Sequence, residues 1–158
     1  GAKTAGYDLI GDGLKANLPD VLAAVARVQL ARFDDLQARR RAIAAHYRSM
    51  LSDLDGLEVV PGSADEGSAN HLMMVLLPPG TDRDAVQKVM SDAQIGTSVH
   101  FRPLHRFAWF AENGVKVGPG GTPNADAAEH RALSLPMHTV LTSGDVERVC
   151  AVLRGALA

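Results

Sequence analysis

The feature that most constrains the fold is a helical pattern that runs from residue 19 to residue 54 of the 158-residue chain. Apolar residues recur at spacings of three and four, which places them on one stripe of a helix. The stripe comprises Val21, Leu22, Val25, Val28, Leu36, Ile43, Tyr47, Met50, Leu51 and Leu54. The pattern is longer than a typical globular helix, so we expect a bend near residues 33–35 that divides it into two helices.

Residues 1–18 are rich in glycine and are predicted to be irregular. Pro19 suits the first position of a helix, because its fixed φ matches the helix and its missing N–H is not needed there. Either Asn17 or Leu18 would then be the N-cap, and Asn17 is the better chemical candidate. Lys15 and Asn17 precede this helix start, a setting that favours anions.

Strand-like and helical patterns alternate after Gly56, which is expected to end the second helix. Three segments have the length and apolar content of strands: 57–61, 71–77 and 95–101. Further helices are predicted at 82–93, 124–132 and 142–157, and residues 133–137 are expected to be extended. This order predicts an α/β fold in which helices cover a small sheet. The connection from 71–77 to 95–101 fits a parallel crossover, and a sheet with antiparallel pairs fits equally well.

The last helix has the clearest amphipathic pattern. Its stripe consists of Val146, Val149, Cys150, Leu153 and Leu157. Thr142 can cap this helix, and Asp145 in its first turn is favoured by the helix dipole. The chain has one cysteine, so no internal disulfide can form, and the sequence fits a reducing compartment.

Charge and hydropathy exclude several classes of protein. The formal net charge of −2 does not predict a nucleic-acid partner, and the arginines at 39–41 follow two aspartates, as on a solvated helix face. No apolar run approaches the roughly 18 residues that span a membrane. The N-terminal stretch lacks the apolar core of a signal peptide. It also lacks a starting Met, so we expect the chain to be a piece of a longer protein.

The segment IGTSVHFRPLH, residues 95–105, brings three polar side chains to a predicted strand end: His100, Arg102 and His105. The two histidines are five positions apart, and no Cys, Asp or Glu joins them at ligand spacing, so no metal site is predicted. The sequence also contains no GxSxG element or similar nucleophile arrangement. These residues therefore indicate a polar cluster at a strand end, and no hydrolytic centre is predicted.

Four segments together resemble the C-terminal part of the DegT/DnrJ/StrS family of pyridoxal-phosphate-dependent sugar aminotransferases. They are GLKANLPDVLAAVARVQLARFDDLQARRRAIAAHY (13–47), NHLMMVLLP (70–78), IGTSVHFRPLHRFAWF (95–110) and LSLPMHTVLTSGDVERVCAVLR (133–154). The third is very close to the family's I-G-T-x-V-H-Y-x-P-L-H element, and the order and spacing agree over nearly the whole chain. The resemblance implies a small, mostly antiparallel sheet of about three strands covered by helices, as in the C-terminal domain of fold-type I aminotransferases.

The resemblance also implies a division of the chain and of the complete enzyme. Residues 1–18 would be an irregular segment, 19–55 a helical link to a large domain lying upstream, and 56–158 the small domain. The complete enzyme would be a cytoplasmic homodimer that transfers an amino group from glutamate or glutamine to a keto-sugar nucleotide. None of the four lysines lies in the family's Schiff-base context, which is followed by Gly-Glu-Gly-Gly. We therefore expect no covalently bound pyridoxal phosphate, no catalytic residue and no activity in this chain alone.

The resemblance also implies supporting roles for individual residues of this chain. Lys15 and Asn17 match the family segment that reaches the cofactor phosphate of the neighbouring subunit. His100, Arg102 and His105 match the element on the sugar-nucleotide side, where imidazole and guanidinium groups suit an anionic, hydroxyl-rich substrate. The alternative is that the chain is a stand-alone, non-catalytic binding or assembly module derived from the same fold.

Overall fold

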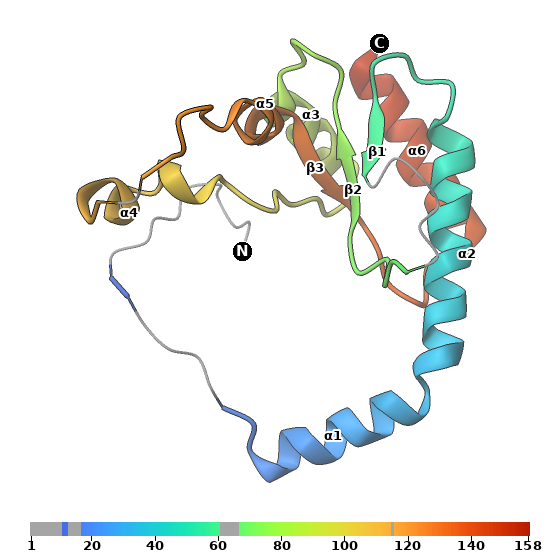
Figure 1. The fold of residues 1–158 in the computed structure, drawn as a ribbon. Coiled ribbons are helices and arrows are strands. Elements are labelled where there is room, and N and C mark those ends of the chain that lie inside the picture. Colours follow the sequence, from blue (N-terminus) through green and yellow to red (C-terminus); the bar gives the residue numbers. More distant parts are fainter. Residues whose placement is uncertain (1–10, 13–16, 61–66, 115) are drawn as a thin grey trace.

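The computed structural model describes residues 11–12, 17–60, 67–114 and 116–158 (Figure 1). The long helical pattern forms two helices, α1 (Asp20–Ala31) and α2 (Phe33–Leu51). They meet at Arg32, which confirms the predicted division. Pro19 occupies the N-cap of α1 and no side chain caps the helix, so the prediction of Pro19 as first helical residue with Asn17 or Leu18 as cap is wrong.

Three short strands form one antiparallel sheet in the order β1-β2-β3. They are β1 (Glu58–Val60), β2 (Met73–Leu76) and β3 (Ala132–Leu135). The third strand comes from the segment that was expected only to be extended. The small antiparallel sheet implied by the resemblance is confirmed, and the parallel crossover that the pattern left open does not occur.

The predicted strand over 95–101 is wrong. This segment contributes only an isolated bridge, in which the backbone of Ser98 pairs with that of Ser134. The alternation of apolar residues predicted one buried face, yet Ile95 is 4% exposed and Phe101 is 66% exposed. A regular strand needs a layer to cover its apolar face along its whole length, and here only the first of these residues reaches the core.

Helices from distant parts of the sequence pack beside the sheet. The longer ones are α3 (Arg83–Asp92), α5 (Pro123–Arg131) and α6 (Ser143–Leu157). Two short helices, η1 (Leu104–Arg106) and α4 (Ala108–Glu112), follow the 95–101 segment. In Figure 1, α3 and α6 lie behind the sheet and α2 runs along its side. α6 contacts both α2 and α3, so these three helices form the layer that closes the core.

The two faces of the sheet differ in what covers them. Met73 and Val75 on β2 are fully buried against the helical layer, whereas the intervening Met74 and Leu76 are only half-buried. Side chains alternate between faces along a strand, so these two pairs point in opposite directions. On β3, Ser134 lies opposite Met74 and therefore shares its face, away from the helical core. Ser134 therefore lies on this second face of the sheet, where the candidate site described below is located.

The last helix forms as predicted. Thr142 accepts a hydrogen bond from the backbone N–H of Asp145, and the Asp145 carboxylate accepts one from the backbone N–H of Thr142, which completes a capping box. Cys150 is fully buried, and burial raises the pKa of its thiol to about 11. The thiol is therefore a packing group and not a reactive one.

α1 contributes nothing to this core. None of its residues is buried, and its apolar side chains are exposed, including Val21 at 75% and Val28 at 59%. In Figure 1 the helix projects away from the sheet and from α6. Across the part of the chain that the structure describes, no helix has both the length and the apolar character required to cross a membrane.

Tyr47→Phe tests a buried contact that joins α2 to the end of β3. The Tyr47 hydroxyl donates to the carbonyl oxygen of Pro136 at 3.0 Å, and burial raises the pKa of the phenol. Removing the hydroxyl leaves that acceptor without its donor, so we expect the free energy of unfolding to fall by about 1–2 kcal/mol. Urea denaturation followed by circular dichroism measures this, and an unchanged midpoint would contradict it.

Candidate functional site

The segment from Ser98 to Phe107 crosses the second face of the sheet and places the predicted site residues there. His100 is half-buried, and its Nδ1 lies 2.9 Å from the Oγ of Ser134 and 3.4 Å from the Oγ of Ser98. The ring of Phe101 meets the imidazole edge-on, with centroids 4.8 Å apart. The peptide bond between His100 and Phe101 is cis.

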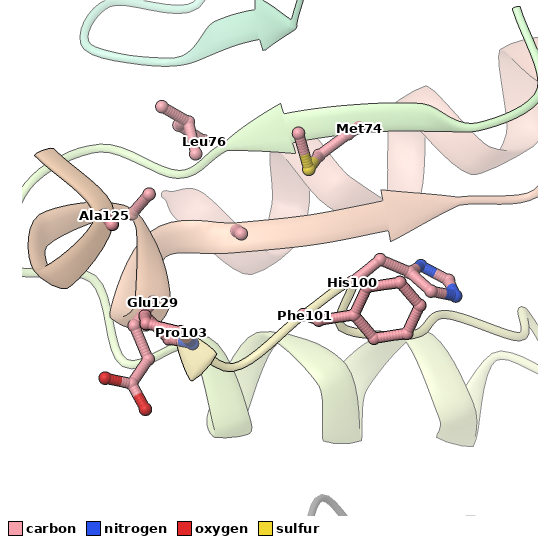
Figure 2. Close-up of a pocket in the computed structure, with 9 residues that line it drawn as sticks. Met74, Leu76, His100, Phe101, Pro103, Ala125 and Glu129 are labelled. Carbon is pink, nitrogen blue, oxygen red and sulfur yellow. The ribbon is translucent and has the colours of Figure 1, made fainter. Parts of the chain in front are cut away.

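A pocket of about 200 Å³ lies between this segment, the second face of the sheet and α5 (Figure 2). Its lining is mostly apolar: Met74, Leu76, Phe101, Pro103, Ala125, Ala128 and Ala132. His100 and Glu129 add the polar groups at its edge, and in Figure 2 the Glu129 carboxylate points away from Met74 and Leu76. A concave apolar surface with few polar groups is the usual form of a small-molecule site.

Arg102 is held by contacts within the chain. Its Nε lies 3.4 Å from Glu129 Oε1, and its guanidinium carbon lies 5.8 Å from the ring centre of Phe107. The Arg102 side chain is nevertheless 44% exposed, whereas that of Glu129 is 14% exposed. The ion pair engages Nε of the guanidinium, and the Arg102 side chain stays partly exposed to solvent.

His105 joins a second set of contacts centred on Asp126 of α5. Its Nε2 lies 2.9 Å from Asp126 Oδ1, and Arg106 Nε donates to the same oxygen at 3.1 Å. Thr122 donates its hydroxyl to the other carboxylate oxygen at 3.0 Å. These hydrogen bonds, first that of Thr122 and then those of Arg106 and His105, hold the pKa of Asp126 below its ordinary value. Asp126 is therefore an anion at neutral pH.

The two sets of contacts meet at Glu129, because Arg106 Nε also lies 3.2 Å from Glu129 Oε2. That oxygen is buried and has no hydrogen bond, so this contact is a charge pair without good alignment. We call Arg102, His105, Arg106, Asp126 and Glu129 the α5 network. Its two arginines and two carboxylates balance in charge, and it ties the 102–106 segment to α5.

Of this network, Arg102 and His105 were expected from the sequence as site residues, whereas Arg106, Asp126 and Glu129 were not. Asp126 and Glu129 are three positions apart and so lie on one face of a helix. That spacing was visible in the sequence, but nothing local showed that this helix packs against residues 102–106. Ser134 was missed as well, since a lone serine in an extended segment carries no signal until its strand neighbours are known.

Of the two residues in the predicted anion site at the start of the first helix, the structure describes only Asn17. Asn17 is exposed and makes no contact with the 98–107 segment that the structure records. Lys15 lies outside the described residues, as does Lys3. The prediction that Lys15 and Asn17 contact a cofactor phosphate therefore stays a prediction.

The described lysines do not fit the Schiff-base role that pyridoxal phosphate requires. Lys88 Nζ pairs with Asp92 on the exposed side of α3, and its side chain is 74% exposed. Lys116 is also exposed. A Schiff-base lysine needs a desolvated pocket in which its amine is nucleophilic, and neither residue lies in one. In the described segments, no group of three or more His, Cys, Asp or Glu residues could hold a metal ion.

Asp126→Asn tests whether the α5 network holds the 102–106 segment in place. The amide cannot supply the two anionic oxygens that Thr122, Arg106 and His105 contact, so we expect residues 102–112 to loosen. The only tryptophan, Trp109 of α4, reports this through its fluorescence. Asp92→Asn is the matched control, because Asp92 belongs to a surface ion pair on α3.

The same contacts give the segment a pH dependence. The pKa of Asp126 is lower when folded, so its stabilising effect is complete above the ordinary carboxyl pKa and is lost as pH falls through the lowered value. We therefore expect the wild-type Trp109 signal to approach that of Asp126→Asn in acid. Identical signals for wild type and variant at neutral pH would contradict the role assigned to Asp126.

Comparisons with known proteins agree with this architecture. The model of the DegT/DnrJ/EryC1/StrS aminotransferase family matches residues 2–154. The aminotransferase TlmJ from Streptoalloteichus hindustanus is 33% identical, with a TM-score of 0.74 over 87% of this chain and 36% of its own. DesV from S. venezuelae, solved with a ketimine intermediate, is 29% identical, with a TM-score of 0.76 over 94% of this chain and 39% of its own.

A third solved structure is the sugar aminotransferase CalS13 from Micromonospora echinospora. It is 26% identical, with a TM-score of 0.73 over 87% of this chain and 35% of its own. The chain thus spans well under half the length of the solved structures that it matches. With a family match over nearly all of its residues, the chain belongs to the DegT/DnrJ/EryC1/StrS aminotransferase family.

Proposed function

We propose that the chain forms the small domain of a pyridoxal-phosphate-dependent sugar aminotransferase. The complete enzyme transfers an amino group from glutamate or glutamine to the keto group of a nucleotide sugar. The observation that carries this proposal is the family match over residues 2–154, in a chain that corresponds to 36% of TlmJ and 39% of DesV. The cytoplasm is the proposed location, since the single cysteine is buried and no internal disulfide is available.

Pyridoxal phosphate, when bound in the complete enzyme, supplies the electron sink for amino transfer. Neither described lysine lies in a desolvated pocket, and none of the four has the Gly-Glu-Gly-Gly context that the resemblance implies. The proposal therefore assigns no Schiff-base role to a lysine of this chain. Lys15 and Asn17 are proposed to contact the cofactor phosphate of a neighbouring subunit. An exposed asparagine just before a helix start is compatible with such a contact, because the first backbone N–H groups of a helix favour anions.

The 98–107 segment is the proposed substrate side. His100 is half-buried and lines the apolar pocket, and the Arg102 side chain is 44% exposed. An arginine fixed by an ion pair loses less freedom when it binds a diphosphate or carboxylate. His105 also belongs to this side, and its Nε2 is engaged by Asp126, so its contribution is to hold the segment in position.

The exposed apolar face of α1 is the proposed contact with the large domain and with the second subunit of a homodimer. Leu18, Val21, Leu22, Val25 and Val28 are all more than half exposed. Apolar side chains at this spacing form a continuous stripe, which is typical of a surface covered by another unit. The core against α2, α3 and α6 is closed without α1, which is the observation that favours the alternative of a stand-alone, non-catalytic module.

Borohydride trapping separates these two candidates from an independent enzyme. We expect pyridoxal phosphate followed by sodium borohydride to leave no stoichiometric label on any one lysine of this chain, because no described lysine lies in a desolvated pocket. Mass spectrometry of the intact chain and its peptides makes the measurement. The same treatment of the complete enzyme, with its own Schiff-base lysine, is the positive control. One fully labelled lysine among the four would contradict the proposed function.

Arg102→Ala in the complete enzyme tests the substrate side. We expect the KM for the keto-sugar nucleotide to rise about tenfold, as is usual on loss of a hydrogen bond to a charged group. The half reaction with the amino donor, followed by the cofactor's absorbance, should keep its rate. Lys88→Ala is the control for loss of a surface cation, because Lys88 pairs only with Asp92 on α3. Equal losses in both half reactions would argue against a substrate-side role.

A further inference from the structure

We propose that Ser134 is a positioning residue that fixes the tautomer of the neutral His100 imidazole, with the ring hydrogen on Nε2. This N–H is then the hydrogen-bond donor that the small domain offers to an oxygen of the keto-sugar nucleotide. The substrate part of the inference rests on the proposed function, whereas the Ser134–His100 coupling does not.

Ser134 is a buried polar residue whose role the fold alone does not explain. It lies in the middle of β3 and is 3% exposed. Its backbone N–H and C=O both pair with Ser98, so its main chain is satisfied by the isolated bridge. Its side chain lies on the second face of the sheet, where the recorded partner of its Oγ is Nδ1 of His100 at 2.9 Å. A buried hydroxyl is costly to leave unpaired. This contact therefore determines both the orientation of the Ser134 hydroxyl and the tautomer of the His100 ring.

Counting hydrogens assigns the tautomer. A serine hydroxyl has one hydrogen to donate, and among the described residues the acceptor within its reach is Nδ1 of His100. If Nδ1 carried the hydrogen instead, the hydroxyl hydrogen of Ser134 would have no acceptor among the described residues. The arrangement with every donor paired therefore has Nδ1 accepting from Ser134, which places the hydrogen of the neutral ring on Nε2.

The other histidine of the segment is arranged differently. Nε2 of His105 lies 2.9 Å from a carboxylate oxygen of Asp126, which can only accept, so this N–H is used within the chain. Nε2 of His100 has no recorded partner among the described residues. The two histidines thus differ in role: His105 anchors the segment to α5, and no described residue uses Nε2 of His100.

The surroundings of His100 favour an uncharged or weakly charged oxygen as its acceptor. The walls of the pocket are mostly apolar, and the nearest cation of the segment, Arg102, is paired with Glu129. A hydroxyl or carbonyl oxygen of the sugar satisfies a neutral N–H donor in such a setting. A diphosphate matches the positively charged, partly exposed side chain of Arg102 better. The small domain would then contact the sugar and the diphosphate through neighbouring residues.

Nitrogen-15 NMR of the 158-residue chain tests the coupling without reference to activity. The shifts of the ring nitrogens and their couplings to the ring protons distinguish a hydrogen on Nε2 from one on Nδ1. At a pH where the ring is neutral, we expect His100 to be wholly the Nε2–H form. Ser134→Ala should give a mixture of the two forms, and Ser134→Thr, which keeps a hydroxyl, should restore the single form.

Ser98→Ala is the matched control, because Ser98 Oγ lies 3.4 Å from the same nitrogen and is exposed. It should leave the tautomer unchanged. An Nδ1–H form in the wild type, or the same tautomer in Ser134→Ala and the wild type, would overturn the role of Ser134. Circular dichroism confirms that each variant is folded, so a change in tautomer is not mistaken for unfolding.

Kinetics of the complete enzyme test the substrate part. We expect His100→Ala and Ser134→Ala each to raise the KM for the keto-sugar nucleotide, by roughly three- to tenfold for loss of one hydrogen bond. The half reaction with the amino donor should be unchanged, and Ser134→Thr should recover most of the effect. An unchanged KM in His100→Ala would overturn the substrate role while the NMR result stands. Failure of the proposed function itself would show as absence of amino transfer in the unmodified complete enzyme.

Discussion

The antiparallel register between β2 and β3 is the constraint on which the rest of the structure depends. Val75 lies opposite Leu133 on the face that meets α2, α3 and α6, and Met74 lies opposite Ser134 on the other face. A slip of one residue would place Val75 opposite Ser134. Either Ser134 would then face the apolar core or Val75 would face away from it, because neighbouring residues of a strand point to opposite faces. The core and the Ser134–His100 contact are therefore specified by the same strand pairing.

The α5 network gives the second face its fixed geometry without regular strand pairing. Beyond the Ser98 bridge, the 98–107 segment has no ladder to hold it, so side-chain contacts to Asp126 and Glu129 take over. Exposed ion pairs add little to stability individually, but several that share two carboxylates restrict where a segment can lie. The network therefore fixes the position of the segment more than it stabilises the fold. A fixed position is what a ligand-binding face requires.

The sequence predicted those parts of the fold that repeat with a helical period and those that local chemistry defines. The division of the long helical pattern and the Thr142 capping box follow from spacing and from cap residues. The strand over 95–101 was wrongly predicted, because alternation alone does not reveal whether a second layer is present to bury Phe101. In the site, His100, Arg102 and His105 were expected from one short segment, whereas Arg106 beside them was not. Asp126, Glu129 and Ser134 come from elsewhere in the chain, and only the packing of α5 and β3 brings them there.

α1 differs from α2 because its apolar face is not packed against any other described part of the chain. A helix of this length is marginally stable by itself in water, since most helical stability in proteins comes from packing an apolar face. The apolar face of α2 is packed, with Ile43, Tyr47 and Leu51 buried, whereas no residue of α1 is buried. No other described residue buries the stripe on α1. Under the proposed function the surface that covers this stripe belongs to the cofactor-binding domain, so the helix that links the two domains would acquire its full stability only when the cleft between them is formed.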